Sequence, residues 1–283
     1  MNNHYNKAEN IMELLPYIKK YKGKTFVIKY GGSAMIKEDI KRAVLQDLVL
    51  LNLMGINIIL VHGGGPAINS ALKESNIEPK FINGLRVTDI ETMKTVERVL
   101  CELNKQIADE ISFNGVQAKP VCADGVLTAH KKLSDGIDLG YVGEVTVVDI
   151  KTLYNLLAQS IIPIIAPIGK DKESNSYNIN ADYAAVAVAA AIKAEKLCFL
   201  TDTEGVLKDQ SDITSVISRL SIKDIQEYIS NGTITSGMIP KVQSCMRGIT
   251  EGITSIHILD GRIKHSIISN IFALDNNGTT IEE

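Results

Sequence analysis

Three glycine-rich segments of this sequence stand where an apolar run is followed by an amphipathic one. They are KYGGS at residues 29–33, HGGGP at 62–66 and TSGMIPK at 235–241, and the first and third contain Lys29 and Lys241. Glycine leaves backbone N–H groups open to a ligand, and helix N-termini favour negative charge. Ligands bind at the carboxyl ends of strands in open α/β sheets. Together the three segments predict a site that handles phosphate.

The common nucleotide-binding templates do not match. The sequence holds no G-x-x-x-x-G-K-[ST] segment of a P-loop NTPase and no H-R-D or D-F-G segment of a protein kinase. At residues 63–68, Ile68 stands where G-x-G-x-x-G requires its last glycine. No serine elbow or Cys/His nucleophile pair is present either, and the scattered histidines are interpreted as structural (His62, His130, His257 and His265).

Two lysines and glycine-rich segments, without an evident catalytic base, suit a kinase whose acceptor is a carboxylate better than one whose acceptor is an alcohol. A kinase that phosphorylates an alcohol usually needs a base for the hydroxyl proton, whereas a carboxylate is already ionised at pH 7. The remaining difficulty is to bring two anions together, which requires fixed positive charge and N–H donors aimed at the transferring phosphoryl group. Lys29, Lys241 and the glycine-rich segments supply both.

The elements around these segments alternate between strands and helices. Short, almost continuously apolar runs are typical of buried parallel strands, and they occupy residues 25–30, 56–62, 118–123, 161–168, 197–201 and 255–259. Helical patterns lie between them at residues 37–54, 66–75, 90–114, 182–194, 221–230, 237–252 and 264–274. This order predicts an α/β fold with an open, mainly parallel twisted sheet sandwiched between helices.

Two segments interrupt the alternation. Residues 125–149 contain turn glycines and an alternating stretch, which predicts a β-hairpin lying over the sheet edge as a flap. Before the first strand, an apolar stripe predicts a short N-terminal helix (Ile11, Leu14, Leu15 and Ile18). That helix would either pack on its own domain or form a protein–protein contact.

Composition narrows the class of protein. The 283 residues are 45% hydrophobic and 22% charged, with a net charge of −3, which gives no basic surface for nucleic acid or anionic lipid. No apolar run is long enough to span a bilayer, and no secretory signal is evident. The four cysteines lie far apart without a C-x-x-C pair, which argues against a zinc site or a disulfide framework and favours a reducing, cytoplasmic location.

From residue 15 to 281 the chain resembles the amino acid kinase family, and within it the branch that acts on N-acetyl-L-glutamate. The resemblance rests on KGKTFVIKYGG (22–32), HGGGP (62–66), NGLRVTD (83–89), NINAD (178–182), LTDTEGVL (200–207), GMIPK (237–241) and LDGRIKHS (259–266). It implies ATP-dependent phosphorylation of the side-chain carboxylate, the second step of arginine biosynthesis. Mg²⁺ would accompany ATP, although no dedicated protein cage for a metal is evident.

The resemblance also implies a role for each matching residue. Lys29 and Lys241 would neutralise the negative charge of the phosphoryl group during its transfer. Asp182 would orient the two lysines, a role that is compatible with its also being a helix N-cap. The backbone N–H groups that contact phosphate would be those of Gly31, Gly32 and Gly64. Substrate would be held by Gly64, Gly65, Arg86 and Asn178, with Arg86 on the α-carboxylate. Thr201, Asp202 and residues 205–207, including Gly205, would lie along the nucleotide.

Relatives with an N-terminal extension are typically hexamers, built as trimers of dimers, and are inhibited by arginine. Residues 1–22 would form that extension, residues 23–180 a lobe for substrate and dimerisation, and residues 181–283 a lobe for ATP. Near the C-terminus, Asn270 replaces a usual acidic residue and Asn276 a usual glycine. Arginine inhibition is therefore a hypothesis at this stage, since a carboxylate that would pair with a guanidinium is missing.

Two alternatives to this function stay open. One is a kinase for free glutamate or another amino-dicarboxylate, against which Arg86 and residues 83–89 speak. The other is a non-catalytic, arginine-sensing protein of the same fold, which would have no need of both Lys29 and Lys241.

Overall fold

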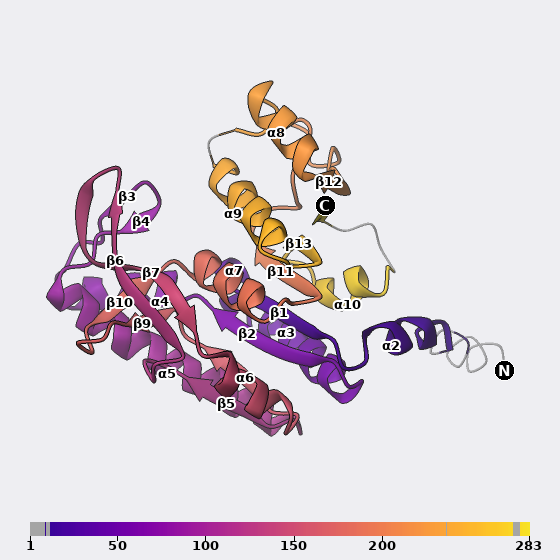
Figure 1. Ribbon diagram of the computed structural model, residues 1–283, viewed down its shortest axis with the longest axis horizontal. Helices are drawn as coiled ribbons and strands as arrows, with labels where there is room; N and C mark the ends of the chain where they lie inside the picture. The colour runs from indigo at the N-terminus through magenta and orange to yellow at the C-terminus, as the bar shows by residue number, and fades with distance from the viewer. Residues whose placement is uncertain (1–8, 10–11, 236, 274–277) are drawn as a thin grey trace.

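A twisted eight-stranded sheet runs through the molecule (Figure 1). The computed structural model describes residues 9, 12–235, 237–273 and 278–283. Within them the strand order is β12 (Arg219–Ser221), β14 (Thr279–Glu282), β13 (Ser255–Asp260), β11 (Lys196–Thr201), β1 (Thr25–Tyr30), β2 (Asn57–His62), β8 (Ile162–Ile165) and β5 (Ala118–Val121). All neighbouring pairs are parallel except β13–β14, so the expected fold class is confirmed.

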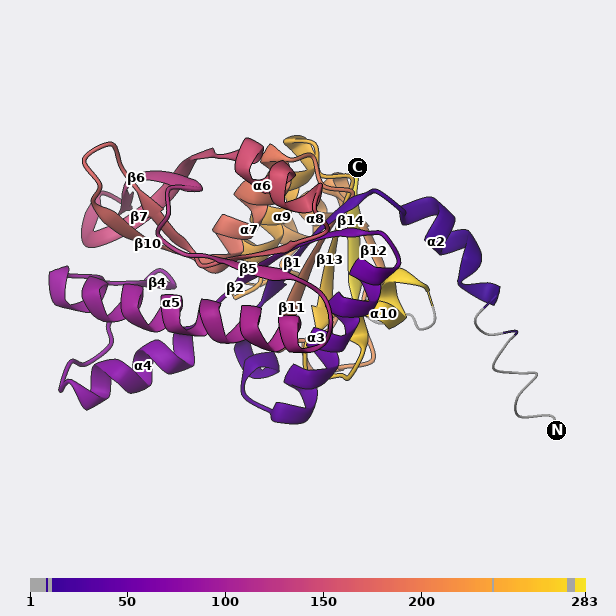
Figure 2. The ribbon, with the colours of Figure 1, turned by 90° about the horizontal axis from the view of Figure 1, so that it is seen from below.

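Helices cover both faces of this sheet because successive residues of its buried strands point to opposite sides. In β1, Val27 belongs to one core cluster, and Phe26 and Ile28 belong to another. The first cluster is completed by α6 (Ile150–Leu157), α7 (Ala181–Ala191), α8 (Ile222–Ser230) and α9 (Ile239–Thr250). The second is completed by α3 (Glu38–Leu53), α5 (Ile90–Phe113) and α10 (Ser266–Ile271). Figure 2 shows α6, α7 and α9 on one side of the sheet and α3 and α5 on the other.

All six predicted strands lie in this sheet, most of them within two residues of the expected ends. The run at 161–168 is divided between β8, in the large sheet, and β9 (Ile168–Lys170), which belongs to a second sheet. The short strands β12 and β14 and the helix α6 were not predicted. The predicted last helix at 264–274 is shorter in the structure, and its final residue lies outside the described part of the chain.

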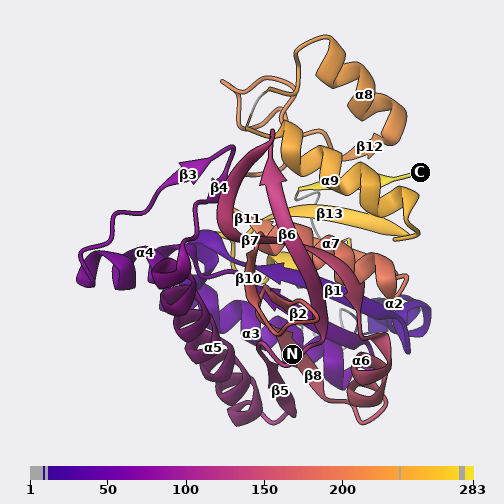
Figure 3. The same ribbon diagram turned by 60° about the vertical axis from the view of Figure 1, so that its left-hand side comes forward.

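The hairpin predicted at residues 125–149 is confirmed, but the expectation of a flap over the sheet edge is wrong. Its strands β6 (Leu127–Ser134) and β7 (Ile137–Val148) join β9 and β10 (Ser176–Ile179) in a small closed barrel (Figure 3). The hairpin is therefore part of a second sheet. A further two-stranded hairpin, β3 (Phe81–Ile82) with β4 (Leu85–Arg86), follows α4 (Gly65–Glu74).

The helix α2 (Leu15–Tyr21) precedes the first strand and projects at one end of the molecule (Figure 1). It packs on its own chain through Tyr17, whose ring meets Phe272 edge-on at 5.7 Å, and through Tyr21, which meets Phe26 at 5.2 Å. Its opposite side leaves Leu15 exposed. Of the predicted stripe, Ile11 lies outside the described residues. None of the helices in the described ranges combines the length and apolarity needed to cross a bilayer.

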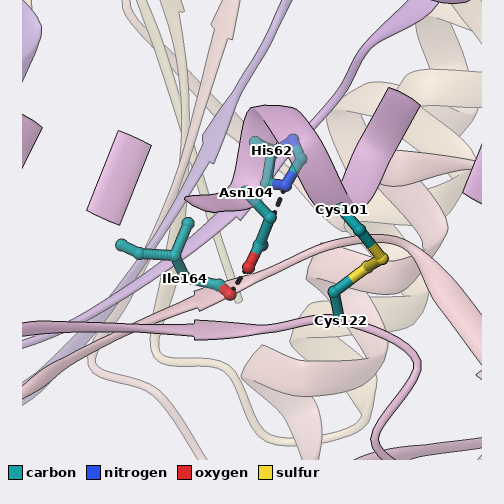
Figure 4. The surroundings of a disulfide bond; sticks show 5 residues. All are labelled: His62, Cys101, Asn104, Cys122 and Ile164. Carbon is teal, nitrogen blue, oxygen red and sulfur yellow. Dashed lines mark hydrogen bonds between the residues drawn. A yellow bond between two sulfur atoms is a disulfide. The ribbon is translucent and has the colours of Figure 1, made fainter. Parts of the chain in front are cut away.

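The structure corrects one inference drawn from the cysteines. Cys101 in α5 and Cys122, directly after β5, form a disulfide across a Cα–Cα distance of 5.5 Å (Figure 4). Their spacing of 21 residues matches no short motif, but α5 leads back into β5 and brings the two residues side by side. Cys198 and Cys245 are free and buried. Cysteine spacing therefore no longer supports a reducing compartment.

Candidate active site

One carboxylate joins the two lysines that the sequence singled out. Asp182 lies in the first turn of α7, Lys29 near the end of β1 and Lys241 in the first turn of α9. The Lys29 Nζ is 3.0 Å from Asp182 Oδ1, and the Lys241 Nζ is 2.6 Å from Oδ2. Asp182 is not the N-cap of its helix, because that position is held by Asn180, whose Oδ1 accepts hydrogen bonds from the backbone N–H groups of Asp182 and Tyr183.

The two lysines keep Asp182 ionised. Burial by itself disfavours its charged form, but the nearby ammonium groups of Lys29 and Lys241 outweigh that effect and lower the Asp182 pKa to about 2. Lys241 also lies over the ring of Phe199, 5.0 Å from its centroid. The result is a partly buried group of three charges with a net charge of +1, whose lysines are held rather than freely rotating.

Two glycines permit the close packing of the loops around this group. Gly32 has φ +64°, and a Cβ there would lie 2.7 Å from Asp202 Oδ1. At Gly64 a Cβ would lie 2.6 Å from Cδ2 of Leu100 in α5. A side chain at either position would have to displace the end of a neighbouring side chain, so glycine lets the loops after β1 and β2 lie close to Asp202 and Leu100.

A buried polar network fixes the loop after β2 (Figure 4). His62 Nδ1 bonds the Gly63 carbonyl at 2.8 Å, so Nδ1 carries the hydrogen, and Nε2 accepts from Asn104 Nδ2 at 2.9 Å. Asn104 also donates to the carbonyl of Ile164 in β8 at 2.8 Å. Burial lowers the His62 pKa to about 4, which keeps the ring neutral. Asn104 could not be singled out from the sequence, because an amide in the middle of a helix is usually solvent-facing.

A cavity of about 350 Å³ opens beside Lys29 and Asp182. The three glycine positions 63–65 form part of its wall, as do Gly31, Gly32, Arg86 and Asn178. Arg86 is only 8% exposed, and burial lowers its pKa. Its backbone carbonyl accepts from the Thr88 hydroxyl, which in turn accepts from Asn178 Nδ2 at 3.1 Å.

The Arg86 guanidinium has two neighbours that the sequence analysis did not identify. Its Nη2 donates to Asn69 Oδ1 of α4 at 2.7 Å, and its Cζ lies 4.7 Å from the ring centroid of Phe81 in β3. The Nη1 atom is buried and has no hydrogen-bond partner among the described residues. Arg86 thus contributes to the cavity wall a guanidinium with one N–H group that is unsatisfied among the described residues.

A second cavity of about 610 Å³ lies on the other side of Lys241. Its walls come from the segment after β11 and from the connection between α8 and α9, and they include Thr201, Gly205 and residues 206–207. Asp202 does not line this cavity, since its carboxylate lies against Gly32. The remaining predicted residues thus fall around two adjoining cavities, with the Lys29–Asp182–Lys241 group between them.

No group of three or more His, Cys, Asp or Glu side chains that could hold a metal occurs in the part of the chain that the structure describes. Both oxygens of Asp182 already face a lysine. The donor set here suits phosphate rather than a bare cation.

A model of the amino acid kinase family matches residues 24–260. The chain is 48% identical over 280 residues to an acetylglutamate kinase of Desulforamulus reducens, with 97% of each chain covered. It is also 48% identical over 278 residues to an acetylglutamate kinase of Thermoanaerobacter pseudethanolicus, covering 97% of this chain and 93% of the relative. The chain belongs to the amino acid kinase family. Within that family this kinase groups with the acetylglutamate kinases.

Solved structures agree on the fold. The N-acetylglutamate synthase of Neisseria gonorrhoeae, complexed with coenzyme A and N-acetyl-glutamate, superposes with a TM-score of 0.86 at 23% identity. The match covers 98% of the kinase and 63% of that longer chain. A second complex of the synthase, with coenzyme A and L-arginine, gives a TM-score of 0.78, also at 23% identity, over 97% of the kinase and 65% of that chain.

Proposed function

We propose that the kinase transfers the γ-phosphoryl group of ATP to the side-chain carboxylate of N-acetyl-L-glutamate, with Lys29 and Lys241 as catalytic residues and Asp182 as the residue that positions them. Acetylglutamate kinase activity, in arginine biosynthesis, is the activity of the group to which the chain belongs. The observation that carries the residue assignment is the Lys29–Asp182–Lys241 group between the two cavities.

The chemistry requires no base. An oxygen of the ionised carboxylate attacks the γ-phosphorus, the bond from that phosphorus to the β–γ bridging oxygen breaks, and ADP leaves with the electron pair. Negative charge on the phosphoryl oxygens meets the ammonium groups of Lys29 and Lys241 and the N–H groups of Gly31, Gly32 and Gly64. Because Asp182 holds both lysines in place, little reorganisation is needed when the charge moves.

The substrates are assigned to the two cavities. The smaller one would take N-acetyl-L-glutamate, with Arg86 on the α-carboxylate and Asn178 and Gly65 on the acetamido end. The larger one would take ATP, along Thr201 and Gly205, while Asp202, which does not line that cavity, would act from beside the Gly32 loop. Mg²⁺ would arrive bound to the phosphates of ATP and neutralise part of their charge, which fits a site whose protein groups are mostly lysines and backbone N–H donors. The division into an amino-acid lobe at 23–180 and an ATP lobe at 181–283 follows the same assignment.

ADP release tests the substrate assignment when N-acetyl-L-glutamate, L-glutamate and L-aspartate are compared in parallel. We expect turnover only with the acetylated compound. Comparable turnover with free glutamate would contradict the assignment in favour of another amino-dicarboxylate kinase. An ATP-binding, folded protein with no turnover on any of the three would instead favour the non-catalytic sensor.

Arginine is the proposed allosteric ligand, and a third cavity of about 380 Å³ is its proposed site. This cavity lies between α2 and the C-terminal strands, and its lining includes Glu195 and Glu282 together with Lys20, Lys196 and Arg219. Glu195 already pairs with Lys24 and Glu282 with Arg219, so a bound guanidinium would have to share or replace these partners. An arginine complex is recorded for the synthase of the same fold. Asn270 in the cavity wall stands where a further carboxylate is usual. Inhibition and a higher melting temperature in millimolar arginine, both weakened by Glu282→Gln, are expected; an unchanged rate and melting temperature would end this proposal.

A hexamer assembled from dimers through the N-terminal extension is the proposed oligomer. The described part of that extension leaves Met12 63% and Leu15 40% exposed, although Tyr17 and Tyr21 pack on the same chain. Light scattering on the full chain and on a version lacking residues 1–22 tests this, with a hexamer-to-dimer change expected. The proposed cytoplasmic location is tested by cell fractionation.

A further inference from the structure

Arg86 is held from two sides by uncharged groups. Asn69 in α4 accepts a hydrogen bond from Nη2 at 2.7 Å, and the Phe81 ring lies 4.7 Å from Cζ. Both partners are neutral, so neither compensates the guanidinium charge. Nη1 stays buried and without a hydrogen-bond partner among the described residues. A buried cation with one unsatisfied donor is costly unless an anion completes it.

Asn69 differs from the other contacts of the site in one respect. Phe81 and Arg86 line the smaller cavity, but Asn69 does not. It lies behind the guanidinium and reaches the substrate only through Arg86. Its helix begins at Gly65, directly after the glycine-rich loop, so α4 connects the loop that would contact phosphate with the orientation of Arg86.

We infer that Asn69 is a positioning residue that orients Arg86 for substrates with an α-carboxylate. The inference rests on the proposed role of Arg86 in binding that carboxylate. An arginine side chain has many rotamers, and fixing it during binding lowers affinity. The hydrogen bond to Asn69 fixes it beforehand, with Phe81 against one face, so that the guanidinium is already oriented at the cavity wall.

The effect belongs to substrate binding and not to phosphoryl transfer. Because the α-carboxylate is at the far end of the substrate from the reacting carboxylate, loss of Asn69 raises the KM for N-acetyl-L-glutamate and leaves kcat and the KM for ATP unchanged. We expect a rise of about fivefold in that KM, the size of the ordering cost for one flexible side chain.

The test uses Asn69→Leu, which keeps the size of the side chain and removes the acceptor. The Asn69→Leu substitution is introduced into the wild-type chain and into the Arg86→Lys variant, whose lysine cannot reproduce the forked hydrogen bonding of arginine. Ser70→Ala is the matched control, since Ser70 is the next residue of α4, is exposed, and among the described residues its hydroxyl bonds the Glu74 side chain of its own helix. Steady-state kinetics for both substrates and a melting temperature are measured for every variant.

The inference predicts that Asn69→Leu raises the KM for N-acetyl-L-glutamate in the wild-type chain and adds no further rise to Arg86→Lys. An unchanged KM in Asn69→Leu, with a raised KM in Arg86→Lys, overturns the inference and leaves the proposed function standing. Equal rises in both backgrounds also overturn it, because Asn69 would then act independently of Arg86. If Arg86→Lys leaves the KM unchanged, the proposed role of Arg86 fails, and this inference fails with it.

Discussion

Replacing Asp182 by asparagine removes the charge that holds the two lysines while keeping the shape of the side chain. The Asp182 pKa of about 2, against an ordinary 3.8, corresponds to roughly 2 kcal/mol of stabilisation at pH 7. Asp182→Asn should lose about that much, because the ammonium groups of Lys29 and Lys241 then face each other without a counter-charge. Their loss of position should lower kcat on the order of 10- to 100-fold.

The stability effect depends on pH in a defined direction. Since the folded-state pKa lies below the unfolded-state value, the stabilisation from Asp182 is complete above about pH 4 and is lost as pH falls through about 2. The stability difference between the wild type and Asp182→Asn should therefore fall to roughly half at pH 3. Urea unfolding at pH 7 and at pH 3 measures it.

Asp149→Asn is the matched control. Asp149 caps α6 through the Thr152 N–H and has no lysine partner in an ion pair of the described residues, and asparagine caps helices equally well. We expect little change in stability or kcat in this control. A stability difference for Asp182→Asn that does not vary with pH, or an unaltered kcat, would refute the role given to this carboxylate.

Three further predictions follow from the same geometry. Lys29→Ala and Lys241→Ala should each lower kcat at least about tenfold and also lower the melting temperature, because each leaves Asp182 with one lysine partner instead of two, and wild-type rates in either would reject its catalytic assignment. Replacing Cys101 and Cys122 by serine should lower the free energy of unfolding by about 3 kcal/mol, the value for a closed loop of about this length, as measured by urea unfolding against the oxidised wild type. Gly64→Ala should raise the KM for N-acetyl-L-glutamate, because the new Cβ would displace the loop or a leucine of α5; unchanged kinetics would mean that the loop has room that the structure does not show.

The central sheet could be predicted because its strands are buried on both faces and therefore read as continuous apolar runs. The short strand β14, at Thr279–Glu282, gave no such signal, because two of its four residues are only partly buried. Residues 161–168 were read as one strand, since an apolar run does not reveal where the chain leaves one sheet for another.

Some residues of the candidate site could likewise be predicted from the sequence, and others could not. Lys29 and Lys241 could be proposed because three glycine-rich segments and two lysines occur together, whereas the role of Asp182 came from the family resemblance. The expectation that all three segments follow strands is wrong for the third, since residues 235–241 connect α8 with α9. Asn69 could not be proposed, since its contact with Arg86 depends on how α4 lies against β4. The disulfide between Cys101 and Cys122 was missed for the same reason, because only the tertiary structure brings these residues together.

Trapping the reaction product with hydroxylamine tests the central claim most directly. An acyl phosphate reacts with hydroxylamine to give a hydroxamate, whereas inorganic phosphate from simple ATP hydrolysis does not. With ATP and N-acetyl-L-glutamate, the wild-type kinase should form hydroxamate in step with ADP, and Lys241→Ala should lower both together. ADP release without hydroxamate would contradict transfer to a carboxylate, and with it the account of the site between Lys29 and Lys241.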